Sequence, residues 1–352
     1  LAKTQLILKH NSWEMVETLS LLQKSLKEKN PILKNLQINI AARELDSVEN
    51  RFNQVWGIVE KTGKTDKNKA KVISGVAFTY AEKFFRQELI LQEIEDKLDV
   101  SSMIKIENAR AKRLGIFAKI LTTYHPDPQV LSRELANSLS PETGTYYKEL
   151  KTAELLQEIE DATEDENQKT SLRLAQYILI ERFEKKVLKL PSAKREELLA
   201  TFVNRIYGNP MREFKTFTRV RRVFQSRELI VFSELYKTKI LVDFEKRVLG
   251  LSTTDLQNQF IEIWVKDPAD LRILEALELR SSTEKNPSPE LAGIVKSLKK
   301  RAFDKISELY KDNPEKLKDT LFYESATSYP DVLDVKVAID VNNSLGDSKV
   351  SA

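Results

Sequence analysis

The chain has no cysteine and only two histidines among its 352 residues. The absence of cysteine excludes disulfide bonds, thiolate metal sites and cysteine nucleophiles. The histidines, His10 and His125, leave few ligands for a metal ion and few groups for acid–base chemistry near neutral pH. We therefore predict no catalytic residues, no cofactor and no metal site, and a protein that is not an enzyme.

Glycine and proline are also scarce, at 9 and 11 residues. Few turn residues favour long helices over a sandwich or barrel. Apolar residues make up 41% of the chain and charged residues 31%, which fits amphipathic helices. The longest apolar stretch, 72–80, is far shorter than the ~20 residues that span a bilayer. We expect an all-α protein that contacts a membrane only through a signal or anchor upstream of Leu1.

The first 100 residues predict an N-terminal helical bundle. One helical segment follows Asn11-Ser12 and is broken at Asn30-Pro31. The next carries apolar residues at helical spacing, beginning with Leu33, Leu36 and Ile40, and stops near Gly63. A third runs from about residue 73 to 98, and we expect these segments to form an antiparallel hairpin with coiled-coil-like packing.

A phosphate-binding loop is excluded at Gly63-Lys64-Thr65, although the three residues resemble the end of one. A Walker loop needs a glycine five residues before Gly63 and a preceding strand, whereas position 58 is isoleucine in a helical segment. The lysines here are interpreted as a solvated turn.

Beyond residue 100 a unit recurs, made of a long, a medium and a short helical segment. In its clearest copy the long segment stops at Pro191, Ser192 opens the medium one, and Asn209-Pro210 precedes the short one. The run 183–191, FEKKVLKLP, returns at 244–252 as FEKRVLGLS. Recurring helical units that bury their apolar faces on their neighbours are typical of stacked arrays.

These patterns predict three parts in the chain. The bundle covers residues 1–100, and an α-solenoid-like array of four three-helix repeats covers 101–343. The repeats span about 101–166, 167–225, 226–287 and 288–343, and a disordered tail covers 344–352.

The charges of the middle region are unevenly distributed. Between Glu142 and Glu166 nine acidic residues face two lysines, a balance of −7. Between Arg182 and Arg227 thirteen basic residues face four glutamates, a balance of +9. The acidic run 158–166 lacks the glycine and spacing of a calcium loop and is interpreted as a solvated connector. If both surfaces lie on one flank, molecules can associate head to tail in a salt-sensitive manner.

The positive segment supplies the candidate interaction residues, which are Arg219, Arg221, Arg222 and Arg227. Arginines beside an aromatic such as Phe224 suit a nucleic-acid backbone, so polyanion or nucleic-acid binding through 182–227 is the alternative function. The competing interpretation is that Phe224 faces the core and that the arginines solvate a long helix.

The stretch 144–156, GTYYKELKTAELL, resembles a Gly-Ser-x-x-Lys-x-Leu-x-x-Leu-Glu-Val-Leu element. That element occurs in exported helical proteins of uncultured candidate-phyla bacteria, which carry an uncharacterised domain without an established activity. Here Thr145 replaces the serine, Ala153 replaces a leucine, and the Pro-Gly-x-Pro-Leu-Tyr hook that usually starts the domain is absent. The resemblance implies export or a surface location and a scaffold-like build.

Together these features favour a non-enzymatic helical repeat scaffold that binds another protein or assembles with itself. We expect an extracytoplasmic or cell-surface location, with a cytoplasmic location as the alternative. Because the chain begins at Leu1 rather than Met, we also expect a mature or truncated product whose leader lies upstream.

Overall fold

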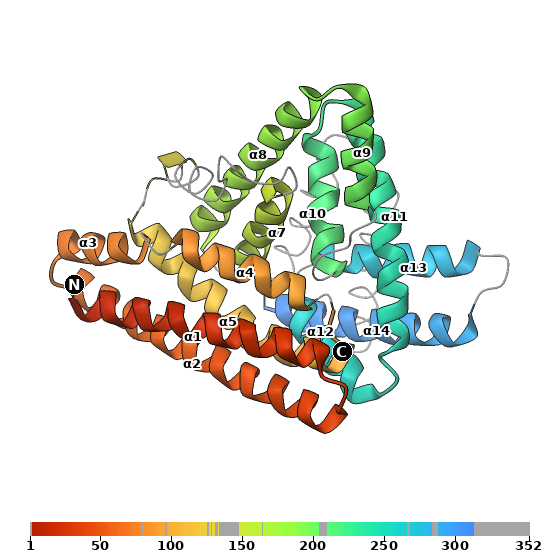
Figure 1. Ribbon diagram of the computed structural model, residues 1–352. Helices are drawn as coiled ribbons and strands as arrows, with labels where there is room; N and C mark the ends of the chain where they lie inside the picture. Colours follow the sequence, from red (N-terminus) through yellow and green to blue (C-terminus); the bar gives the residue numbers. More distant parts are fainter. Residues whose placement is uncertain are drawn as a thin grey trace. The chain divides into compact units, whose positions relative to one another are not determined.

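The protein is helical wherever the structure describes it. A computed structural model describes residues 2–312 except 79–80, 96, 125–126, 128, 131–132, 134–147, 164, 204–209, 266–267 and 284–287 (Figure 1). Every regular element in these ranges is a helix, and no strand forms among them, so the prediction of an all-α protein is confirmed. The predicted tail at 344–352 and the start of the GTYYKEL motif lie outside the described residues.

The helices follow one another along the chain with short connections. They are α1 (Ala2–Lys27), α2 (Pro31–Gly63), α3 (Lys67–Phe78), α4 (Ala81–Glu95), α5 (Val100–Tyr124), α7 (Lys148–Asp161), α8 (Glu166–Leu188), α9 (Ser192–Val203), α10 (Pro210–Val223), α11 (Arg227–Leu249), α12 (Thr254–Trp264), the 3₁₀ turn η1 (Pro268–Asp270), α13 (Leu271–Thr283) and α14 (Pro289–Tyr310).

Local sequence explains where these helices start. Asn30 caps α2, because its side chain accepts hydrogen bonds from the backbone N–H groups of Ile32 at 3.0 Å and Leu33 at 3.4 Å. Pro31 occupies the first turn, where its missing N–H costs nothing. Asp165 caps α8 in the same way, accepting from the N–H of Gln168 at 2.9 Å.

The contacts divide the chain into two units, one of residues 1–212 with 216–236, the other of 213–215 with 237–352. In the first unit α1 and α2 pack as an antiparallel hairpin (Figure 1). The amide of Asn11 on α1 donates to the carbonyl of Val48 on α2 at 3.4 Å. Gln87 on α4 donates to the carbonyl of Ser12 at 2.9 Å, which ties α4 to the hairpin.

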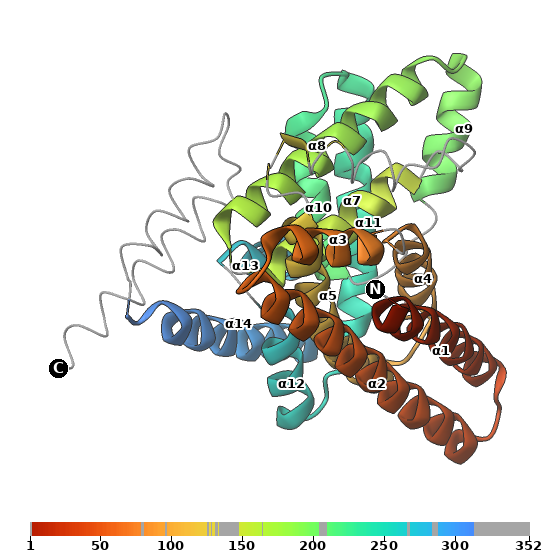
Figure 2. The ribbon, with the colours of Figure 1, turned by 90° about the vertical axis from the view of Figure 1, so that its left-hand side faces the viewer.

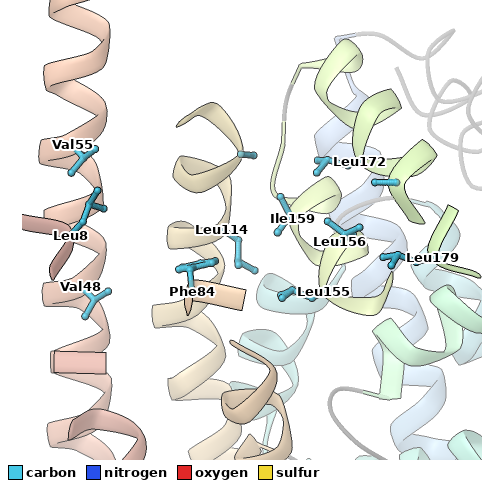
Figure 3. Packing of buried hydrophobic residues seen from close by; sticks show 12 residues of the cluster. Leu8, Val48, Val55, Phe84, Leu114, Leu155, Leu156, Ile159, Leu172 and Leu179 are labelled. Carbon is cyan, nitrogen blue, oxygen red and sulfur yellow. The ribbon is translucent and has the colours of Figure 1, made fainter. Parts of the chain in front are cut away.

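One hydrophobic cluster runs through the first unit (Figure 3). It includes Leu8 and Val48 of the hairpin, Leu114 of α5, Leu156 of α7 and Leu172 of α8. The helix α5 also packs on α2 and α3. The unit therefore has contacts across residue 100 and across residue 166, the two positions where the sequence suggested boundaries.

In the second unit, α13 and α12 each contact α14. The ring of Phe260 packs on Phe244 with centroids 6.0 Å apart and on Trp264 at 4.1 Å. Ser288 caps α14 by accepting from the N–H of Leu291 at 3.2 Å, and Pro289 follows it at the first helical position.

An aromatic cluster joins α8, α9, α10 and the first half of α11 within the first unit. The ring of Phe232 lies 5.5 Å from Phe202, 6.1 Å from Phe217 and 6.5 Å from Phe183, measured between centroids. Tyr236 stands 4.2 Å from Phe217. All five rings are buried, so this cluster is a main source of hydrophobic stabilisation at this end of the unit.

We predict that Phe232→Ala lowers the free energy of unfolding by about 3–5 kcal/mol, because it leaves a cavity among four aromatic neighbours. The control is Leu235→Ala, three residues along the same helix, whose side chain is 56% exposed. The control should change stability by less than about 0.5 kcal/mol. Urea unfolding followed by circular dichroism measures both, and equal losses would contradict the packing described here.

Candidate functional site

The helix α7 is buried along nearly its whole length despite a polar sequence. Its glutamates Glu149, Glu154, Glu158 and Glu160 are each at most 3% exposed. The interpretation of the acidic run as a solvated connector is therefore wrong for Glu158 and Glu160. An ionised carboxylate is costly to bury without a cationic or hydrogen-bonding partner, so the partners of these residues decide whether α7 can be buried.

Arg110 of α5 lies at the centre of a buried ionic cluster, and its side chain is fully buried. Its Nε is 2.6 Å from Glu88 Oε2 on α4, and its Nη1 is 3.3 Å from Glu95 Oε2 and 3.5 Å from Glu107 Oε2. Its Nη2 forms an ion pair with Glu158 of α7. Burial opposes the charge of Arg110, but the carboxylates of Glu158, Glu95 and Glu88 outweigh it and raise the pKa of Arg110 above its usual value.

Arg212 of α10 completes this cluster from a segment distant in sequence. Its Nη1 is 2.8 Å from Glu158 Oε1, and its Nη2 pairs with Glu107. Four carboxylates thus surround two guanidinium groups. The glutamate side chains are at most 2% exposed and that of Arg212 is 13% exposed, so a substrate has no access to the carboxylates.

The cluster is built for stability rather than chemistry. Each of its four carboxylates is held by an arginine, and no exposed nucleophile or base lies among the six groups. Across the described residues no group of three or more histidine, aspartate and glutamate side chains has the geometry of a metal site.

A second ionic group surrounds Glu160 near the end of α7. Arg173 of α8 donates to its Oε1 from Nη2 at 2.7 Å, and Gln176 donates to its Oε2 at 3.1 Å. Arg219 of α10 donates to both oxygens, with Nη2 3.3 Å from Oε1. Burial alone raises the pKa of Glu160, but the charges and hydrogen bonds of Arg219 and Arg173 lower it below the usual value.

The four predicted interaction arginines do not form one surface. Arg219 points inward to Glu160, with a side chain 16% exposed. Arg221 pairs with Glu234 of α11 at 2.7 Å, in an exposed position, and Arg222 and Arg227 are exposed. Phe224 is buried and its ring centroid lies 6.1 Å from that of Phe183, so the interpretation of Phe224 as a core residue is confirmed.

The positive segment is largely neutralised within the chain. Lys186 pairs with Glu149, and Arg195 Nε lies 2.7 Å from Glu228 Oε1. Lys215 lies 3.4 Å from Asp270 in the second unit. Much of the charge asymmetry in the sequence therefore serves to pair α7 and its neighbours with basic side chains.

Exposed apolar side chains gather on the hairpin instead. Of the fifteen large apolar residues exposed in the described ranges, seven lie on α1 and α2. On α2 they form a stripe, which we call the α2 ridge, of Ile32, Leu33, Leu36 and Ile40. Their helical spacing suggested a buried stripe, but the structure buries α2 from Ile38 and Ala41 instead.

On α1 the exposed apolar residues are Leu6, Trp13 and Val16. Beside them is an open hollow of about 600 Å³ lined by Leu6, Ile7, Lys9, His10, Trp13, Arg51 and Gln54. The rings of His10 and Trp13 stack with centroids 6.1 Å apart. Sequence reasoning missed this surface, because periodicity shows that a helix has an apolar face but not which turns another helix covers.

Comparison with protein-family models, with curated proteins and with solved structures finds no match to this chain. The fold and the site thus define the protein only as an all-α protein with a buried ionic core and an apolar hairpin surface. No helix in the described ranges combines the length and apolar character needed to cross a bilayer.

We predict that Arg110→Met destabilises the protein by about 3–5 kcal/mol, because it leaves buried carboxylates with only one guanidinium partner. Arg221→Met is the matched control and removes an exposed pair, at a cost of about 1 kcal/mol or less. Thermal and urea unfolding compare the two variants. Similar losses for both would mean that the buried cluster is not a special source of stability.

The lowered pKa of Glu160 predicts acid sensitivity. A carboxylate with a lowered folded pKa contributes stability above its unfolded pKa and loses that contribution as the pH falls through the folded value. Glu160→Gln should therefore be most destabilising near neutral pH, and its deficit should shrink below about pH 4. Unfolding curves across this range test the sign, with Glu181→Gln on the exposed side of α8 as control. A deficit that is constant with pH would contradict the prediction.

Proposed function

We propose that this protein is a non-enzymatic helical scaffold that associates with a second copy of itself through the α2 ridge. The observation that carries the proposal is the exposure of Ile32, Leu33, Leu36 and Ile40, with Ile32 at 76% and Leu36 at 52%. Apolar groups left in water at helical spacing are typical of a face that another helix covers.

The second half of the chain supports a repeat architecture for this scaffold. The helices α8, α9 and α10 have 23, 12 and 14 residues, and α11, α12 and α13 have 23, 11 and 13. A third long helix, α14, has 22 residues. Phe183 and Val187 of α8 and their counterparts Phe244 and Val248 of α11 are all buried. Stacked units of this kind provide extended surfaces for macromolecular partners.

A second copy suits the ridge because its stripe can pair with itself. When two identical helices cross in an antiparallel, two-fold arrangement, each apolar stripe faces the other, which makes an isologous contact. The residues beside the stripe include the uncharged Asn35 and Asn39, which add no repulsion. A standard interface uses about 20–30 residues on each side, so four apolar side chains predict a weak, concentration-dependent association.

The observed ion pairs change how self-association should depend on salt. Because Arg219 holds Glu160 and Arg212 holds Glu158 within one chain, these residues are occupied inside the fold. Apolar contacts should therefore dominate, and association should persist at high salt. Nucleic-acid binding through 182–227 is less favoured for the same reason, and an extracytoplasmic location stays a prediction from the resemblance.

Sedimentation velocity over a range of protein concentrations tests the proposal. We expect the wild-type protein to associate at high concentration, in low and in high salt, and Leu36→Asp/Ile40→Asp to remain monomeric. Leu279→Asp, which changes a leucine 50% exposed on α13, is the control and should associate like the wild type. A wild-type protein that is monomeric throughout, or a ridge variant that associates normally, would overturn the proposal.

A further inference from the structure

The end of the N-terminal bundle where α2 meets α3 is strongly basic. Five exposed lysines lie between residues 61 and 71, namely Lys61, Lys64, Lys67, Lys69 and Lys71. Asp66 is the single acidic residue in this stretch, and its carboxylate is occupied locally. It accepts a hydrogen bond from the N–H of Lys69 at 3.1 Å and lies 3.4 Å from the Lys69 ammonium group.

The start of α1 adds apolar and basic side chains at the same end. Figures 1 and 2 both draw the beginning of α1 beside α3, and the two helices are in contact. Leu6 is 69% exposed and Trp13 57%, and Lys3 and Lys9 are exposed beside them. On α3, Val72 is 53% exposed.

The acidic residue of this part of α1 is turned away from solvent. Glu14 has a side chain only 13% exposed, where it pairs with Arg51 of α2 and lies 3.3 Å from His10 Nε2. Between Ala2 and Val16 the exposed charges are therefore those of lysines. The exposed face combines positive charge with protruding apolar groups and an aromatic ring.

We infer that this end of the bundle binds an anionic membrane surface. The lysines contact lipid phosphates, while Leu6, Trp13 and Val72 enter the interfacial layer. Peripheral attachment commonly needs two such signals, an apolar insertion and a polybasic patch. Tryptophan favours the interface because its ring is apolar and its N–H is polar. A nucleic acid would use the lysines but has no use for exposed aliphatic side chains.

The test measures partition of the full chain to vesicles of phosphatidylcholine with or without phosphatidylglycerol. We expect binding to the anionic vesicles only, weakened by salt, together with a blue shift of tryptophan emission that Trp13→Phe abolishes. Lys64→Glu/Lys67→Glu should lower the partition coefficient about tenfold or more, since each lysine near such a surface contributes about 1 kcal/mol. The matched control Lys185→Glu/Lys246→Glu changes two lysines 73% and 70% exposed elsewhere and should bind like the wild type.

The apolar contribution is tested separately with Leu6→Ser/Val72→Ser, which should also weaken binding. Its control is Leu279→Ser/Leu309→Ser, at exposed leucines of α13 and α14. Four outcomes would overturn the inference: no binding to anionic vesicles, equal losses in the controls, no effect of the apolar substitutions, or binding of duplex RNA without binding of vesicles. Circular dichroism shows that each variant is folded, and Leu36→Asp/Ile40→Asp should bind vesicles normally, which separates this inference from the proposed function.

Discussion

The burial of carboxylates on α7 is the constraint on which the first unit depends. A helix with glutamates on several faces can enter a protein interior only if cationic groups reach each of them, because an unpaired buried charge is strongly destabilising. Here Arg110 of α5 and Arg212 of α10 meet Glu158, while Arg173 of α8 and Arg219 of α10 meet Glu160. Four helices are thus fixed around α7 by charge as well as by the apolar cluster that contains Leu155, Leu156 and Ile159.

This constraint explains why the polar helices are inside. The segment that forms α10 carries several arginines, yet Met211, Phe214, Phe217 and Val220 between them are all buried. Long arginine side chains can bury their carbon stems while their heads bond to a carboxylate. A buried ion pair contributes little net stability compared with an apolar pair, but it penalises any arrangement in which one partner is missing. The charges of α7 and α10 therefore specify which helices pack together.

Because the interior holds so much of the charge, the surface features that remain are concentrated on the hairpin. The α2 ridge is apolar and suits a helix, whereas the lysine-rich end near α3 combines charge with Leu6 and Trp13 and suits an anionic surface. The two regions lie on different turns of α1, α2 and α3, so one chain can hold both contacts. A scaffold that attaches to a surface and associates with its copies needs no catalytic group, which agrees with carboxylates that are enclosed rather than open to a substrate.

The sequence by itself determined the helical class and many of the helix boundaries. Asn30-Pro31, Pro191-Ser192 and Asn209-Pro210 act through local backbone chemistry, so α2, α9 and α10 begin where these residues predict. The recurring pattern of apolar residues likewise marked Phe183 and Phe244 as core positions. Tertiary structure alone decided that Glu158 and Glu160 are buried, that Arg219 faces inward and that Leu36 and Ile40 face solvent. The reason is physical: periodicity is set by neighbours along one helix, whereas burial and charge pairing depend on which distant helices cover each turn.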